Sequence, residues 1–186
     1  MTYDETCYIN LKDGTIEDSA EGYLHCDKLI APTILELNNK GYKTTASCSG
    51  HSTKLHASNP IEIQIDNNDG MSVEEQIEKA LLYCYQQGMI VMVNRVDKNT
   101  IYLDALSTGT YIYVSFQKIY DFPNLPKEFM KSDDSQNRTS IGKWIERRRS
   151  DNTYKTNKEF YQEIVLANQE LLEWAKSLDY NIEKNI

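Results

Sequence analysis

The sequence predicts an α+β fold, a two-layer mixed sheet with helices packed on one face and a C-terminal helical segment. Three observations predict it. Short β-prone runs alternate with helical patterns early in the chain, further strands follow one another around turn signals, and the C-terminal part has helical spacing. The 186 residues suffice for one domain with a proper hydrophobic core.

The first elements lead into a polar loop. Residues 6–11 and 22–26 are β-prone, residues 30–39 carry apolar side chains at helical spacing, and Gly41 ends that helix. A strand begins near residue 43 and breaks at the Ser-Gly pair of the segment Ser47 to Ser52. This segment concentrates hydroxyl, thiol, glycine and imidazole groups.

The middle of the chain predicts a strand, a helix and three more strands. Residues 61–65 alternate as in a half-buried strand, and Ser72 and Glu75 form a capping box that opens a helix ending at Gly88. Strands are then expected at 89–93, 100–105 and 111–116. Because turn signals separate them, we expect an antiparallel meander.

The C-terminal part is expected to be helical after a polar loop at 131–138, with helices at 140–149 and 157–178. These boundaries give an α+β ligand-binding core at 1–130 and C-terminal helices at 139–186 that pack on it.

Composition restricts the classes of function. The formal charge of −8 argues against non-specific binding of nucleic acid. Transmembrane segments and a signal peptide are not expected, so a membrane partner is not predicted, and the four cysteines are expected to be reduced in a cytoplasm. The composition leaves a homo-oligomer open.

The loop is the first candidate site. A strand ending in a small polar segment can expose backbone N–H groups and hydroxyls together, which makes an anion cradle. The expected ligand-binding residues of the loop are Ser47, Cys48, Ser49, Gly50, His51 and Ser52. The alternative is a tight turn whose polar groups satisfy only their own backbone.

The basic run at 143–149 is the second candidate. Arg147 and Arg148 could hold phosphates through paired N–H donors, and Trp144 could stack on a base. The alternative is a solvated helix face that offsets an acidic surface.

Metal binding and catalysis are weaker hypotheses. His25, Cys26, Cys48 and His51 could meet in a zinc site, but their spacing matches no standard finger and free cysteines usually pack in cores. We therefore expect neither a metal nor another cofactor. A Cys–His hydrolase is also disfavoured, because proximity in sequence does not place an imidazole nitrogen on a thiol. We assign no catalytic residue.

The segments Asp27 to Asn38 and Tyr42 to Gly50 resemble the front of the wybutosine-synthesis methyltransferases that act on tRNA. That family carries an Asp, a helix ending in Leu-Asn, a Thr-rich strand and Ser-Cys-Ser-Gly-Arg, and this chain has His51 at the arginine position. The resemblance covers residues 27–51. The chain also looks like small uncharacterised proteins of Gram-positive bacteria and their phages that share a Cys-Ser-Gly-His signature. The resemblance implies a ligand around the loop.

The leading hypothesis is a cytoplasmic protein that binds a small anionic, nucleotide-like ligand without turnover, as a phage-type protein that sequesters a nucleotide immune signal would. The sequence leaves open whether the chain is an enzyme, and binding without turnover is favoured because it shows no complete acid–base or nucleophile set. One alternative is a divergent RNA methyltransferase dependent on S-adenosylmethionine. Another is a zinc-stabilised interaction module.

Overall fold

The computed structural model describes residues 6–17, 24–51, 60–106, 108–132 and 138–181. Within these residues it contains three helices and three antiparallel sheets, which confirms the α+β class. The elements are β1 (Thr6–Ile9), β2 (Ile16–Glu17), β3 (Leu24–Asp27), α1 (Ala31–Asn39), β4 (Thr44–Cys48), β5 (Ile61–Gln64), α2 (Val73–Gln86), β6 (Ile90–Val96), β7 (Thr100–Leu106), β8 (Gly109–Phe116), β9 (Met130–Ser132), β10 (Ser140–Glu146) and α3 (Asn157–Ser177). None of the helices in the described ranges has both the length and the apolar composition of a membrane span.

The chain divides into two compact units. Unit 1 comprises Met1–Ser52 and Gly109–Ile186, and unit 2 comprises Thr53–Thr108. The division predicted from the sequence, with a core at 1–130 and C-terminal helices at 139–186, differs from these two units. Sequence patterns alone could not show that Thr53–Thr108 forms a unit of its own between β4 and β8.

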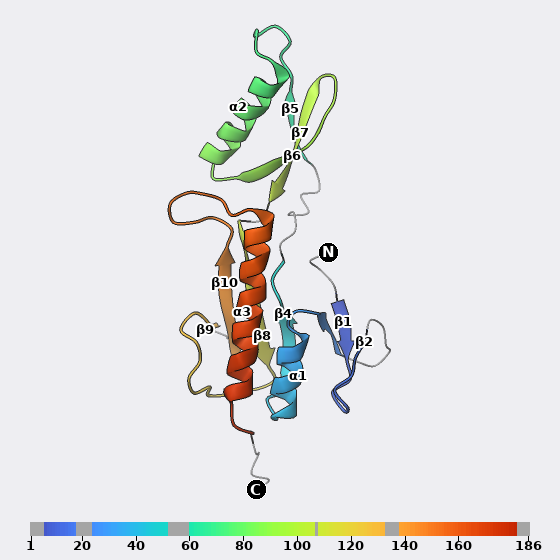
Figure 1. The fold of residues 1–186 in the computed structure, drawn as a ribbon, viewed down its shortest axis with the longest axis vertical. Helices are drawn as coiled ribbons and strands as arrows, with labels where there is room; N and C mark the ends of the chain where they lie inside the picture. The colour runs from blue at the N-terminus through green and yellow to red at the C-terminus, as the bar shows by residue number, and fades with distance from the viewer. Residues whose placement is uncertain (1–5, 18–23, 52–59, 107, 133–137, 182–186) are drawn as a thin grey trace. The chain divides into compact units, whose positions relative to one another are not determined.

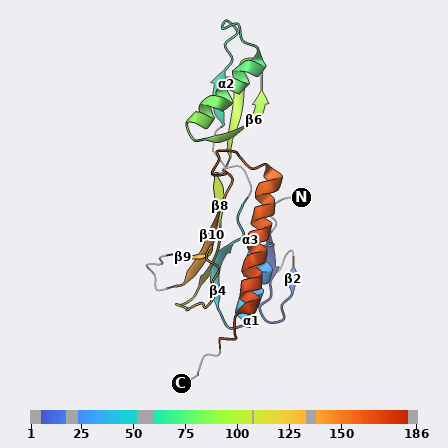
Figure 2. The same cartoon turned by 60° about the vertical axis from the view of Figure 1, so that its left-hand side comes forward.

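Unit 1 is built on a four-stranded antiparallel sheet in the order β4-β8-β10-β9. Helices α1 and α3 lie together on one side of it (Figures 1 and 2). Alternate residues of β8, including Ile112, Val114 and Phe116, are fully buried with the apolar residues of these helices. The opposite face of the sheet carries the remaining residues of each strand. A two-layer arrangement with helices on one face is therefore present, although all pairings in the described residues are antiparallel and the strands form three sheets.

A small sheet of order β2-β1-β3 completes unit 1. Cys7 of β1 lies opposite Cys26 of β3, and both side chains belong to the core. The register of this pair also places the end of β3 at Asp27, opposite Thr6.

Lys40 joins α1 to the end of α3. Its side chain is almost fully buried, and Nζ donates to the carbonyl oxygens of Ala175, Lys176 and Leu178. These are carbonyls that a helix end leaves without intrahelical partners. The lysine therefore caps α3 and fixes it beside α1.

Unit 2 consists of α2 and the antiparallel sheet β5-β7-β6. Ile101 and Leu103 of β7 are fully buried with Ala80 and Cys84 of α2. The predicted capping box is confirmed, because Ser72 accepts from the Glu75 backbone and Glu75 accepts from the Ser72 backbone. The predicted meander is correct for β6 and β7 and wrong for β8, which pairs with β4 and β10 of unit 1.

The predicted helix at 140–149 is wrong, because residues 140–146 form strand β10, paired with both β8 and β9. Its buried isoleucines, Ile141 and Ile145, are four residues apart. That spacing fits one face of a helix and also one face of a strand, so the apolar pattern alone could not decide. The tryptophan between them favours the strand. The C-terminal segment thus supplies one strand and one helix. The first two residues of the expected loop at 131–138 lie in β9, and residues 133–137 lie outside the described residues.

Candidate functional site

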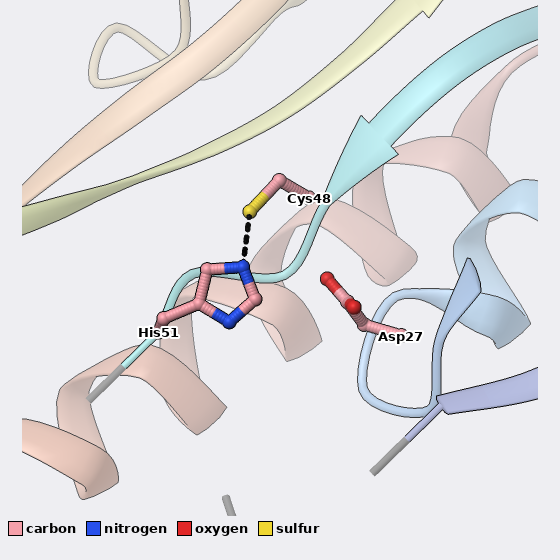
Figure 3. A group of neighbouring side chains, drawn as sticks. All are labelled: Asp27, Cys48 and His51. Carbon is pink, nitrogen blue, oxygen red and sulfur yellow. Dashed lines mark hydrogen bonds between the residues drawn. The ribbon is translucent and has the colours of Figure 1, made fainter. Parts of the chain in front are cut away.

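Three side chains that can bind metals or transfer protons meet where β3 and β4 end (Figure 3). Asp27 is the last residue of β3 and Cys48 the last residue of β4, while His51 lies three residues further along the chain. Cys48 Sγ is 3.3 Å from His51 Nε2. We call Asp27, Cys48 and His51 the loop cluster. His51 is exposed and the other two are half-buried, so solvent reaches the cluster from the side of the imidazole.

The backbone of the loop is held by three hydrogen bonds that its own N–H groups donate. Ser49 N donates to Asp27 Oδ2 at 2.8 Å, and Gly50 N lies 3.4 Å from Cys48 Sγ. His51 N donates to Thr110 Oγ1 at 2.8 Å. These three donors already have internal acceptors, so the anion cradle expected from the sequence is not available in this conformation.

Gly50 allows the loop to turn against the sheet. Its φ is +84°, a conformation that costs an L residue energy. A Cβ at this position would lie 3.0 Å from Ile112 Cγ1 and 3.0 Å from Thr110 Cγ2, both on β8. Both the backbone angle and the close approach to β8 therefore require glycine.

Helix α3 anchors the loop from the other side. Asn168 is almost fully buried, and its Nδ2 donates to Ser49 O at 2.9 Å and to Ile164 O at 2.8 Å. Ser49 is itself buried. The position of the loop cluster is thus determined by β3, β8 and α3 together. Of the other expected loop residues, Ser47 lies within β4 and Ser52 lies outside the described residues.

Cys48 and His51 of the loop cluster have the composition of a nucleophile–base pair. A thiol 3.3 Å from an imidazole nitrogen can transfer its proton. Acyl transfer also needs N–H donors aimed at the developing oxyanion. The N–H groups of Ser49, Gly50 and His51 already donate to other acceptors. These three N–H groups therefore hold the loop and are not free to bind an oxyanion in this conformation.

The sheet face opposite the helices of unit 1 carries three aromatic side chains, Tyr111, Tyr113 and Trp144. Tyr111 of β8 is paired with Trp144 of β10, and Tyr113 is paired with Gly142 on one side and Cys48 on the other. Directly opposed residues share a face of the sheet. Trp144 is 49% exposed and Tyr111 36% exposed. We call these three residues the aromatic face, and its register places it beside the loop cluster.

Two of the rings lie over glycines of the neighbouring strand. Atoms of the Tyr111 ring would be 2.2 Å from a Cβ on Gly142, and Trp144 Cζ2 would be 2.4 Å from a Cβ on Gly109. The rings of Tyr111 and Tyr113 lie side by side, with centroids 6.3 Å apart and planes 31° apart. Burial raises the pKa of the Tyr113 hydroxyl, and the acidic groups of Cys48 and Asp27 raise it further. The Tyr113 hydroxyl therefore lies close enough to Cys48 and Asp27 for their charges to change its pKa.

Within the basic run at 143–149, Arg147 does not lie at the surface, where a phosphate could reach it. Arg147 is 2% exposed, donates from Nη1 to Asn157 Oδ1 at 2.7 Å and lies over the ring of Phe160, 4.3 Å from its centroid. Its burial lowers the pKa of the guanidinium. Arg148 donates to Asn152 Oδ1 at 2.6 Å. Arg147 is thus a core residue of unit 1, whereas Arg148 is half-buried and Arg149 is exposed.

The zinc ligands considered from the sequence do not all converge. Cys26 Sγ lies 4.0 Å from Cys7 Sγ in the core, where burial raises the Cys26 pKa to about 12. His25 is exposed and its ring lies 4.9 Å from that of Tyr8. Among the described residues, the group that can share a metal contains Asp27 together with Cys48 and His51.

No family model, curated protein or solved structure matches this chain. The resemblance of residues 27–51 to the wybutosine-synthesis methyltransferases stays a prediction.

Sequence reasoning missed several residues that build the site. Asp27 was noted only in the resemblance, and Asn168 lacked any local signal because its partner Ser49 is 119 positions away. Tyr111 and Tyr113 had a signal, since alternation along 111–116 with apolar residues at 112, 114 and 116 predicts that both tyrosines share the other face.

Proposed function

We propose that this protein binds a small anionic, nucleotide-like molecule without turnover, with the planar base stacked on the aromatic face. The observation that carries the proposal is the presence of three rings on one face of the sheet, in register with the loop cluster. Every nucleobase offers a π-face to such a surface. A base above Tyr113 would direct its sugar and phosphate toward Cys48 and His51.

Binding without turnover is favoured by the way the loop is used. Its N–H groups hold the loop in place and are not aimed at a reacting atom. Such a protein can act by sequestration, which lowers the free concentration of its ligand. Turnover can be tested directly, because a nucleotide recovered intact after prolonged incubation with the protein has not reacted.

The alternative role of the aromatic face is purely structural. Rings that cover glycines on a neighbouring strand stabilise a sheet in the absence of any ligand. Substitution of Trp144 would then change the free energy of unfolding and leave ligand affinity unaffected. The two roles are therefore separated by measuring both quantities on the same variants.

The test is a calorimetric titration of the full chain with adenosine monophosphate, cyclic adenosine monophosphate, S-adenosylmethionine and hexauridylate. Stacking contributes about 1–3 kcal/mol per base, so Trp144→Ala and Tyr111→Ala should each weaken binding of the best mononucleotide roughly 5- to 150-fold. Tyr180→Ala is the control, because Tyr180 is 70% exposed and lies outside the aromatic face.

Unchanged affinity in both aromatic variants, with binding by wild type, would refute stacking. Failure of every mononucleotide to bind, or tighter binding of hexauridylate than of any mononucleotide, would contradict a small-ligand function. Methyl transfer from S-adenosylmethionine to RNA would favour the methyltransferase alternative.

A further inference from the structure

The loop cluster offers one thiol sulfur, one imidazole nitrogen and one carboxylate oxygen within 4.8 Å of one another (Figure 3). Zinc accepts these three donor types and takes them tetrahedrally. With a Zn–S bond of about 2.3 Å and a Zn–N bond of about 2.0 Å, a tetrahedral angle separates sulfur and nitrogen by about 3.5 Å. The 3.3 Å between Cys48 Sγ and His51 Nε2 is close to this value. These two ligands therefore need little movement to share an ion.

The surroundings orient two of the three ligands. Ser49 N donates to Asp27 Oδ2 at 2.8 Å, and this hydrogen bond holds the carboxylate of Asp27 in place. Gly50 N lies 3.4 Å from Cys48 Sγ, in position to stabilise a thiolate. Hydrogen bonds to metal ligands of this kind hold them in place and adjust their basicity. The backbone bond from His51 N to Thr110 fixes the start of the imidazole side chain.

The charges also favour a cation. A carboxylate and a thiolate side by side repel each other, and a divalent cation between them would offset both charges. The same cation would remove the repulsion that Asp27 exerts on an anionic ligand near the loop. Because His51 is exposed, an ion can enter from solvent.

We propose that Asp27, Cys48 and His51 form a binding site for one zinc-type divalent cation, with three protein ligands and a fourth position open to water or an anion. An open fourth position is typical of zinc sites that act on a ligand, whereas structural sites use four protein ligands. This proposal departs from the sequence expectation of no metal and replaces His25 and Cys26 with Asp27 in the ligand set.

The experiment is a titration of the untagged, metal-free full chain with Co²⁺, followed by Zn²⁺. Tetrahedral Co²⁺ bound to a thiolate gives visible d–d bands and a near-ultraviolet charge-transfer band. We expect both signals to saturate at one Co²⁺ per chain and to disappear when Zn²⁺ displaces it. The titration contains no nucleotide, so its outcome is independent of the stacking proposal.

Variants assign the ligands. Cys48→Ser should abolish the charge-transfer band, while His51→Gln and Asp27→Asn should each weaken Co²⁺ binding by more than about tenfold, since even outer hydrogen-bond partners of metal ligands contribute that much. Asp27→Asn keeps an oxygen that can accept from Ser49 N, so the loop anchor survives. His25→Gln is the control and should bind as wild type does.

Absence of a charge-transfer band in the wild type would overturn the proposal, as would a band that persists in Cys48→Ser. If Cys48→Ser does not fold by circular dichroism, the solvent-exposed His51→Gln decides, and wild-type affinity in that variant would also overturn it.

Discussion

Replacement of Gly50 by alanine tests whether the loop is built on its close approach to β8. The left-handed conformation costs an L residue about 1–2 kcal/mol. The new Cβ would also meet Ile112 and Thr110 at 3.0 Å, and crowding of this kind costs about 1–3 kcal/mol. We therefore expect Gly50→Ala to lower the free energy of unfolding by about 2–5 kcal/mol.

Gly14→Ala is the matched control in the same unit. Gly14 has φ +77°, but its Cβ would lie at an ordinary 3.6 Å from Leu35. It should cost only the conformational part, about 1–2 kcal/mol. Urea unfolding followed by tryptophan fluorescence reports on unit 1, because Trp144 and the buried Trp174 both belong to it. Equal losses in the two variants would refute a close-packed loop.

Two further predictions concern unit 1. Arg147→Ala should lower the free energy of unfolding by about 2–4 kcal/mol without changing nucleotide affinity, because a charged hydrogen bond and a contact with Phe160 are lost; denaturant unfolding and calorimetry together measure this. The Thr156 backbone N–H donates to the Glu159 carboxylate and lowers the pKa of Glu159 below its ordinary value of 4.5. The stability that the ionised Glu159 adds to the folded state is therefore fully present above pH 4.5. It is lost as the pH falls through the lowered pKa of the folded state. The difference in melting temperature between wild type and Glu159→Gln should therefore shrink on acidification, and a difference that stays constant down to pH values well below 4.5 would contradict this assignment.

Local signals were sufficient for much of the fold. The capping box of α2 was predicted correctly, because it is formed by two residues three positions apart in the chain. The helix between 30 and 39 and the strand at 61–65 were likewise found within one or two residues. These elements depend on contacts between near neighbours in the chain.

The remaining features depend on distant contacts. Strand β10 was mistaken for a helix because its partners β8 and β9, and not its own spacing, decide its conformation. Two residues of the loop cluster, Cys48 and His51, were predicted because they lie close together in the sequence. Asp27 was not, because the backbone N–H with which it forms a hydrogen bond, that of Ser49, is 22 positions away. The sequence prediction put Arg147 at the surface on the basis of its charge alone. Its burial against Phe160 follows from tertiary packing that the basic run does not encode.

The most direct test of a nucleotide-like ligand on the aromatic face is proton NMR of the aromatic rings during titration with adenosine monophosphate. A base stacked on the sheet should shift the ring protons of Tyr111 and Trp144 upfield through its ring current. The rings of Tyr42 and Tyr120, buried on the helix side of the sheet, should not shift. Saturable upfield shifts confined to the aromatic face are the result we expect. Unmoved Tyr111 and Trp144 resonances at saturating nucleotide would contradict the proposal.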